Sequence, residues 1–203
     1  MNNTHTITAT ALSKKFGRVR LFRDLSFSLD RGDSLALTGP NGSGKSTLLM
    51  ITAGLLAPTT GSVEYRLGRE LMDRDLFIKH CGIAAPSVNP YRELTVQENM
   101  DFAMQGNGGS DMNEFLEAFC LHEHRGKRVK HLSTGMLQRL KFIIAVMNDP
   151  DVLLLDEPGS NLDERGRDAV YSYIESAKEK KIIVIATNDT AEAALCKRGI
   201  SLG

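Results

Sequence analysis

The chain has 203 residues, and its 25 lysines and arginines balance 25 aspartates and glutamates, so its formal net charge is zero. With 41% hydrophobic and 25% charged residues, the composition is that of a globular domain and excludes disorder as the main state. A neutral chain has no overall attraction to nucleic acid or to an anionic membrane. Binding to either partner therefore requires a local site.

No segment of the sequence predicts export or membrane insertion. The Thr- and Asn-rich residues 1–15 lack the basic and apolar parts of a secretory signal. The longest apolar runs, 152–155 and 182–186, are far shorter than the roughly 20 residues of a membrane-spanning helix. The three scattered cysteines, Cys81, Cys120 and Cys196, are expected to be reduced. We expect a cytoplasmic protein that could work at a membrane only through another chain.

Hydrophobic periodicity predicts alternating strands and helices. The predicted strands are residues 25–29, 34–38, 152–155 and 182–186, the last two as unbroken apolar runs typical of buried parallel strands. The predicted helices are residues 46–55, 113–121, 135–147 and 164–179. This alternation predicts an α/β fold with a mostly parallel sheet. Two loose segments, PSVNP at 86–90 and GNGGS at 106–110, interrupt this alternation of strands and helices. The polar, helical stretch 94–132 is expected to form a small inserted subdomain.

The clearest motif follows the strand at 34–38 and precedes the helix from 46. It reads GPNGSGKST and fits the P-loop pattern GxxxxGK[ST]. Its glycines let backbone N–H groups turn inward around an anion, Lys45 supplies charge to the outer phosphates, and Ser46 offers a hydroxyl to Mg²⁺. An accidental glycine-rich turn is disfavoured by this context. The predicted nucleotide-binding residues are Gly39, Pro40, Asn41, Gly42, Ser43, Gly44, Lys45, Ser46 and Thr47.

A second motif is the apolar strand 152–155 followed by Asp156, Glu157 and Pro158. In a parallel sheet this strand would deliver both acids to the edge where the P-loop lies. Asp156 is expected to join Ser46 as a Mg²⁺ ligand, and Glu157 to polarise the attacking water. The alternative is a buried strand that ends in an acidic turn.

Residues 132–139, LSTGMLQR, resemble the LSGGQ signature of ABC-type ATPases. The order of P-loop, signature, DEP and the D-loop SNLD at 160–163 is similar to that family over nearly the whole chain. The resemblance implies one P-loop NTPase core with mostly parallel strands and an antiparallel β portion near the N-terminus. It also implies that this core, about 1–93 and 141–203, carries an inserted helical subdomain at about 94–140.

The same resemblance implies a head-to-tail dimer that holds two ATP molecules, each between one copy's P-loop and the other copy's signature. The resemblance leaves open whether the two cassettes of this dimer are copies of the same chain or two different chains. Phe16 matches the aromatic that stacks on adenine in relatives, with a core position as the alternative. The residues implied for the contact across the dimer are Ser133, Thr134, Gly135 and Met136 of the signature and Asp163 of the D-loop.

The chain departs from the family at three places. Relatives carry a glutamine where this chain has Pro86 or Ser87, and a γ-phosphate-sensing histidine where it has Asn188. Asn188 can donate a hydrogen bond but cannot carry charge. The signature has Thr134 for glycine and Met136 for glutamine. We expect ATP binding to persist while hydrolysis is slow, with Glu157 as the main catalytic residue and Asn188 as a weaker γ-phosphate contact.

Two other clusters invite alternative functions. Cys120, His122 and His124 have a spacing that matches no closed metal site, with His131 as the nearest further ligand, so a metal is not expected there. The basic run 125–131 has no interleaved aromatic residue and predicts a solvated surface rather than a nucleic-acid site.

The motifs therefore predict an ATP-hydrolysing subunit that powers an ABC transporter. Its helical subdomain and loop 86–90 would dock on cytoplasmic helices of a separate permease, so it would lie on the inner face of the membrane. The alternatives are an ABC-type ATPase that acts on nucleic acid or ribosomes and a slowly hydrolysing ATP switch. A compact cassette without a coiled coil or basic arm favours the transporter. The permease would determine the transported molecule and direction.

Overall fold

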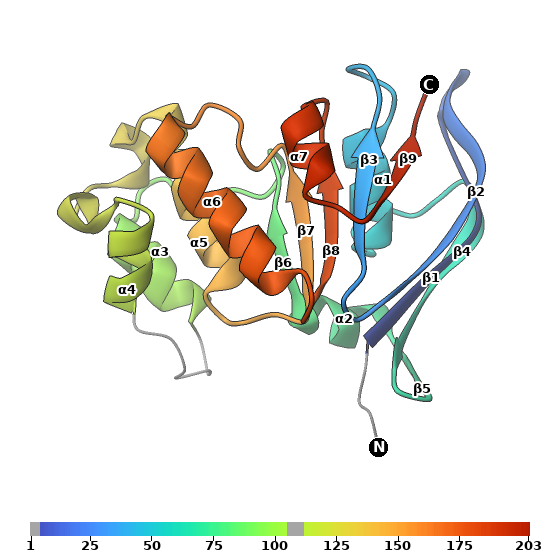
Figure 1. Ribbon diagram of the computed structural model, residues 1–203, viewed down its shortest axis with the longest axis horizontal. Coiled ribbons are helices and arrows are strands. Elements are labelled where there is room, and N and C mark those ends of the chain that lie inside the picture. The colour runs from blue at the N-terminus through green and yellow to red at the C-terminus, as the bar shows by residue number, and fades with distance from the viewer. Residues whose placement is uncertain (1–4, 105–111) are drawn as a thin grey trace.

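The computed structural model describes residues 5–104 and 112–203. The loose segment 106–110 noted in the sequence lies outside them. Two sheets form the framework (Figure 1). One is parallel, in the order β6 (Cys81–Ala84), β7 (Val152–Asp156), β8 (Ile182–Ala186), β3 (Ser34–Thr38) and β9 (Arg198–Ser201). The other is antiparallel, in the order β2 (Val19–Asp30), β1 (His5–Phe16), β4 (Thr60–Leu67) and β5 (Glu70–Met72). The predicted α/β fold with an antiparallel portion near the N-terminus is confirmed.

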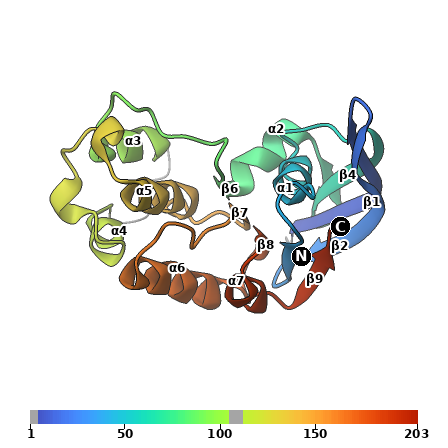
Figure 2. The same cartoon turned by 90° about the horizontal axis from the view of Figure 1, so that it is seen from above.

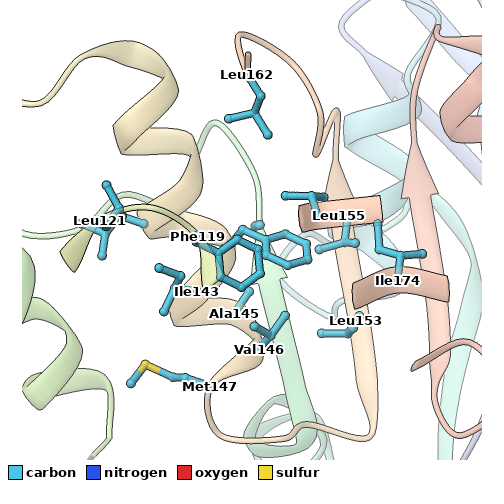
Figure 3. Packing of buried hydrophobic residues seen from close by; sticks show 14 of the residues in the cluster. Phe119, Leu121, Ile143, Ala145, Val146, Met147, Leu153, Leu155, Leu162 and Ile174 are labelled. Atoms are coloured by element: carbon cyan, nitrogen blue, oxygen red, sulfur yellow. The ribbon is translucent and has the colours of Figure 1, made fainter. Parts of the chain in front are cut away.

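The central strands are apolar because both faces of the parallel sheet are covered. Along β7, Leu153 and Leu155 join one hydrophobic cluster, whereas Val152 and Leu154 join the other. The first cluster contains α5 (Thr134–Val146) and α6 (Glu164–Ala177), and Figure 3 shows Phe119, Ile143 and Ile174 gathered over this face. The second contains α1 (Lys45–Thr52) and the inner face of the antiparallel sheet. The unbroken apolar runs thus reflect a sheet packed between two layers.

The helix after the P-loop ends earlier than predicted. The sequence predicts a helix to residue 55, but α1 ends at Thr52 because Gly54 adopts a positive φ of 72°. The amides of Gly54 and Leu55 donate to the carbonyls of Ile51 and Met50, the paired bonds of a Schellman motif. The predicted helices at 113–121, 135–147 and 164–179 correspond to α4 (Met112–Ala118), α5 and α6, with ends that differ by at most three residues.

Helices α3 (Val96–Ala103), α4 and α5 lie together beside the β6 edge of the parallel sheet (Figure 2). Helix α3 begins at a capping box, in which Thr95 and Glu98 satisfy each other's backbone amides. The predicted limits of the helical subdomain, 94 and 140, stay predictions. The remaining short helices are α2 (Arg74–Phe77), α7 (Thr190–Ala194) and the 3-10 turns Ile78–His80, His122–His124 and Val129–His131.

Among the described residues, no helix combines the length and apolar character needed to cross a membrane. The three cysteines are free and partly buried.

Candidate nucleotide site

The P-loop turns between β3 and α1 around the buried ammonium of Lys45. Nζ of Lys45 donates to the carbonyls of Gly39 at 2.9 Å and Pro40 at 3.2 Å, and the side chain is only 6% exposed. At Gly39, with φ 137°, a Cβ would lie 2.0 Å from the Leu202 carbonyl oxygen, so only glycine fits. These contacts hold the Lys45 ammonium against the backbone of the glycine-rich loop, and a positive charge in such a loop is suited to binding phosphate.

A cavity of about 400 Å³ opens over this loop. The residues that line it are Leu21, Asn41, Gly42, Gly44, Lys45, Ser46, Thr47 and Glu157. The structure therefore brings Glu157 to the P-loop across more than a hundred residues, at the carboxyl end of the parallel sheet. No residue of the signature segment 133–136 is among these lining residues.

Asp156 and Ser46 form the candidate Mg²⁺ position. Asp156 is 4% exposed, and its Oδ2 is buried without a hydrogen-bond partner in the described structure. Burial raises the pKa of its carboxyl, while a hydrogen bond with the Ser46 hydroxyl and the charge of Lys45 act in the opposite direction. A buried carboxylate oxygen left free beside a hydroxyl fits a hard divalent cation such as Mg²⁺.

Glu157 occupies a backbone position that the neighbouring elements fix. Its φ is 48°, its amide donates to the Ala186 carbonyl of β8 at 2.8 Å, and its carbonyl accepts from the Gln138 side chain of α5 at 3.2 Å. A non-glycine residue with positive φ persists only where surrounding contacts hold it. Glu157 is therefore presented to the cavity by a turn tied to both β8 and α5.

Asn188 follows the end of β8 and contacts the P-loop. Its side-chain Nδ2 donates to Oδ1 of Asn41 at 3.2 Å, and both side chains are exposed. An amide in this place can reach an anion held over the P-loop, but it cannot change its charge.

The signature begins helix α5. Ser133 is the N-cap, and its Oγ accepts from the Met136 amide at 3.3 Å. A Cβ on Gly135 would lie 2.7 Å from the Asn161 carbonyl oxygen, so the signature packs directly against the D-loop. Because Ser133 and the first amides of α5 lie at the positive end of a helix, they could bind an anion supplied from outside this copy.

Asp163 caps the next helix, α6, and links it to α5. Its carboxylate accepts a hydrogen bond from the Gly166 amide and pairs with the Arg139 guanidinium. Both interactions lower the pKa of Asp163, and the hydrogen bond from Gly166 has the larger effect. Gln138 and Arg139 therefore connect the signature helix to the β7 acids and to the D-loop within one copy.

Sequence reasoning did not single out two buried charged residues near the site. Lys141 of α5 is 8% exposed, and its Nζ donates to the Ala85 carbonyl at 3.3 Å, directly before Pro86. Burial lowers the pKa of Lys141. Glu192 of α7 is 3% exposed and accepts from the Gly159 amide at 2.7 Å. The one sign of Lys141 in the sequence was its position as a charged residue within an apolar helical run.

The remaining sequence predictions concern residues that are not part of the cavity lining. Phe16, at the end of β1, is 53% exposed with the Lys14 ammonium 4.8 Å from its ring, so its face is partly occupied. In the basic run, Arg125 donates to Gln97 and Lys130 pairs with Glu93 at 2.6 Å. Cys120, His122 and His124 lie at the turn after α4.

A P-loop whose cavity is lined by Glu157, with the buried Asp156 beside it, defines a nucleotide-binding protein of the P-loop NTPase class. The family profile described as ABC transporter matches residues 22–160. The chain is 35% identical over 200 residues to the probable multidrug ABC transporter ATP-binding protein YbhF of Escherichia coli (strain K12), a match covering 95% of this chain and 34% of that relative. It is 33% identical over 179 residues to the lantibiotic transport ATP-binding protein SrtF of Streptococcus pyogenes, covering 87% and 77%.

Its fold is also similar to the dimeric structure of MJ0796, a bacterial ABC transporter cassette, with a TM-score of 0.80, 25% identity, and coverage of 97% of this chain and 94% of that one. The chain belongs to the ABC transporter family and is an ATP-binding domain of that family. It spans about a third of the length of its Escherichia coli relative.

Proposed function

We propose that this chain hydrolyses ATP to power a transporter whose membrane-spanning permease is a separate protein. The observation that carries the proposal is the meeting of Lys45, Ser46 and Glu157 around one cavity, beside the buried Asp156. The transport-related relatives and the groove described below support the coupling to a permease.

The residues of the site divide the chemistry of hydrolysis among them. The P-loop amides and Lys45 hold the outer phosphates, and Ser46 and Asp156 would hold Mg²⁺, which neutralises charge between phosphate oxygens. The Glu157 carboxylate accepts a hydrogen bond from the attacking water and orients it. Because Ser133 does not line this cavity, we propose that Ser133 of a second copy completes the site from the other side, as in a dimer of cassettes.

The same proposal includes slow ATP hydrolysis by this chain. Pro86 or Ser87 stands in place of the switch glutamine and Asn188 in place of the histidine, so Glu157 acts with fewer partners. Replacing Asn188 with histidine is expected to raise ATP turnover severalfold, because an imidazole can carry charge toward the γ-phosphate. Steady-state phosphate release at saturating ATP measures this. A large loss of turnover in Asn188→His, with ATP affinity unchanged, would show that the asparagine has a specific role of its own.

A groove of about 220 Å³ beside loop 86–90 is proposed as the docking site for one cytoplasmic helix of the permease. Tyr91 and Phe102 form its exposed apolar wall, 56% and 49% exposed, with ring centroids 5.0 Å apart. Lys141 is the one charged side chain among the described residues that line it, and its ammonium donates a hydrogen bond to the Ala85 carbonyl. An ammonium with free donors in an apolar groove favours a helix that carries an acidic side chain.

Co-purification from detergent-solubilised membranes tests the proposed function. We expect a multi-span protein, identified by mass spectrometry, to be recovered in fixed ratio with the wild-type chain. Lys141→Glu should reduce this recovery at least about tenfold, because it turns charge attraction into repulsion. Phe102→Asp should do the same from an exposed position, and Lys127→Glu, on an exposed turn, should have no effect. Recovery with RNA or DNA instead would support the nucleic-acid alternative.

A further inference from the structure

A second cluster of chemically active side chains lies at the opposite end of the parallel sheet from the nucleotide cavity. It consists of His5 at the start of β1, His80 directly before β6, and Asp151 directly before β7. Asp151 and Asp156 stand at opposite ends of β7, about 16 Å apart along an extended strand. The cluster is therefore separate from the nucleotide site.

The distances within the cluster are those of a metal's ligand set. Nδ1 of His80 lies 3.2 Å and Nδ1 of His5 3.7 Å from Oδ2 of Asp151. One ligand atom from each of the three residues lies within 4.8 Å of the other two. A tetrahedral ion with bonds of about 2.0–2.1 Å places its ligand atoms about 3.3 Å apart. The two histidine–aspartate distances lie on either side of that value.

His5 is buried without the hydrogen bonds that would account for a structural role. The residue is 5% exposed, and its Nε2 has no hydrogen-bond partner in the part of the chain that the structure describes. Its Nδ1 is too far from Asp151 for a hydrogen bond. Buried polar atoms are normally satisfied, so each exception calls for a partner that the protein atoms do not supply. His80 and Asp151, with side chains 31% and 44% exposed, leave a path from solvent to the cluster.

Both sheets hold the ligands in place. His5 pairs with Leu67 of β4 in the antiparallel sheet. Asp151 accepts the Ile182 amide at 3.0 Å through its backbone carbonyl, next to the first pair of β7 and β8. The three side chains are therefore brought together by the fold before any ion binds.

We propose that His5, His80 and Asp151 bind one divalent transition-metal ion of the Zn²⁺ type, with water in the fourth position. Two imidazole nitrogens and one carboxylate suit Zn²⁺, whereas Mg²⁺ and Ca²⁺ take oxygen ligands. The ion ties the start of β1 to the base of β6 and β7, and so joins the antiparallel sheet to the parallel one. No nucleotide-binding residue is among its ligands, so the ion would act on the joining of the two sheets and not on the ATP site.

Titration of the metal-free chain with Zn²⁺ alone, followed by calorimetry in the absence of nucleotide, tests the proposal. We expect one strong site in the wild type. His80→Asn and Asp151→Asn should each weaken binding at least about tenfold, because each removes a direct ligand. The matched control His122→Asn, on an exposed turn outside the cluster, should bind Zn²⁺ as the wild type does. Zn²⁺ should also raise the midpoint of thermal unfolding of the wild type and control, and of neither ligand variant.

Two results would overturn the proposal. One is the absence of a strong Zn²⁺ site in the folded wild type, which would leave His80 and Asp151 as a simple hydrogen-bonded pair. The other is unchanged Zn²⁺ affinity in both His80→Asn and Asp151→Asn, which would place the ion elsewhere on the chain. Circular dichroism of each variant verifies that it is folded, and the two separate ligand variants keep the test decisive if one of them is not.

Discussion

Replacing Glu157 with glutamine is expected to lower ATP turnover about a hundredfold or more, because the amide cannot accept a proton from water. ATP affinity should stay within about twofold of the wild type, since the P-loop and Lys45 supply the phosphate contacts. The substitution is nearly isosteric, and hydrogen bonds between the backbone of residue 157 and both the Ala186 carbonyl and the Gln138 side chain hold the turn that presents it. Phosphate release and equilibrium binding of a fluorescent ATP analogue, measured in parallel, separate catalysis from binding.

Glu117→Gln is the matched control for this prediction. It makes the same change of charge on the exposed face of α4, away from the nucleotide cavity, and should leave turnover unchanged. Turnover in Glu157→Gln within about twofold of the wild type would contradict the assignment of Glu157 as the main catalytic residue.

The sequence predicted those parts of the fold whose signal is local. Strands β3 and β8 begin and end where predicted, because each is a short apolar run buried on both faces. Strand β1 was not predicted, although residues 6–9 alternate polar and apolar side chains. Alanines occupy some of its apolar positions, and register shifts on either side of Leu12 interrupt its pairing with β2, so the periodic signal is weak. Four-residue strands such as β6 and β9 depend on neighbours far along the chain and are too short for periodicity to reveal.

The same distinction applies to the sites. The P-loop and the two acids at the end of β7 are contiguous motifs, so their residues could be named from spacing alone. Lys141 could not, because its position beneath the groove depends on how α5 packs against the segment after β6. The cluster of His5, His80 and Asp151 joins residues from three distant segments, and only the packing of the two sheets brings them together.

The second large effect concerns the completion of the ATP site by another copy. Lys45→Ala is expected to lower turnover at least about a hundredfold, because it removes the buried charge that faces the outer phosphates. Ser133→Asp is expected to have a similar effect for a different reason. Aspartate keeps the N-cap of α5 and so preserves the helix, but its charge repels a triphosphate presented to the signature.

Each variant disables a different half of the proposed composite site. A Lys45→Ala copy retains an intact signature, and a Ser133→Asp copy retains an intact P-loop with Glu157. A mixed dimer therefore contains one site with both halves intact. A mixture of two Lys45→Ala preparations is the control, since no pairing in it restores a P-loop lysine.

The central claim is that ATP is hydrolysed between the P-loop of one copy and the signature of another. The measurement that tests it most directly is ATP turnover in an equimolar mixture of the Lys45→Ala and Ser133→Asp chains. We predict that each chain alone is nearly inactive and that the mixture recovers roughly a quarter of wild-type turnover, because about half of its dimers hold one intact site of two. Full activity of Ser133→Asp alone, or a mixture as inactive as its components, would contradict the claim.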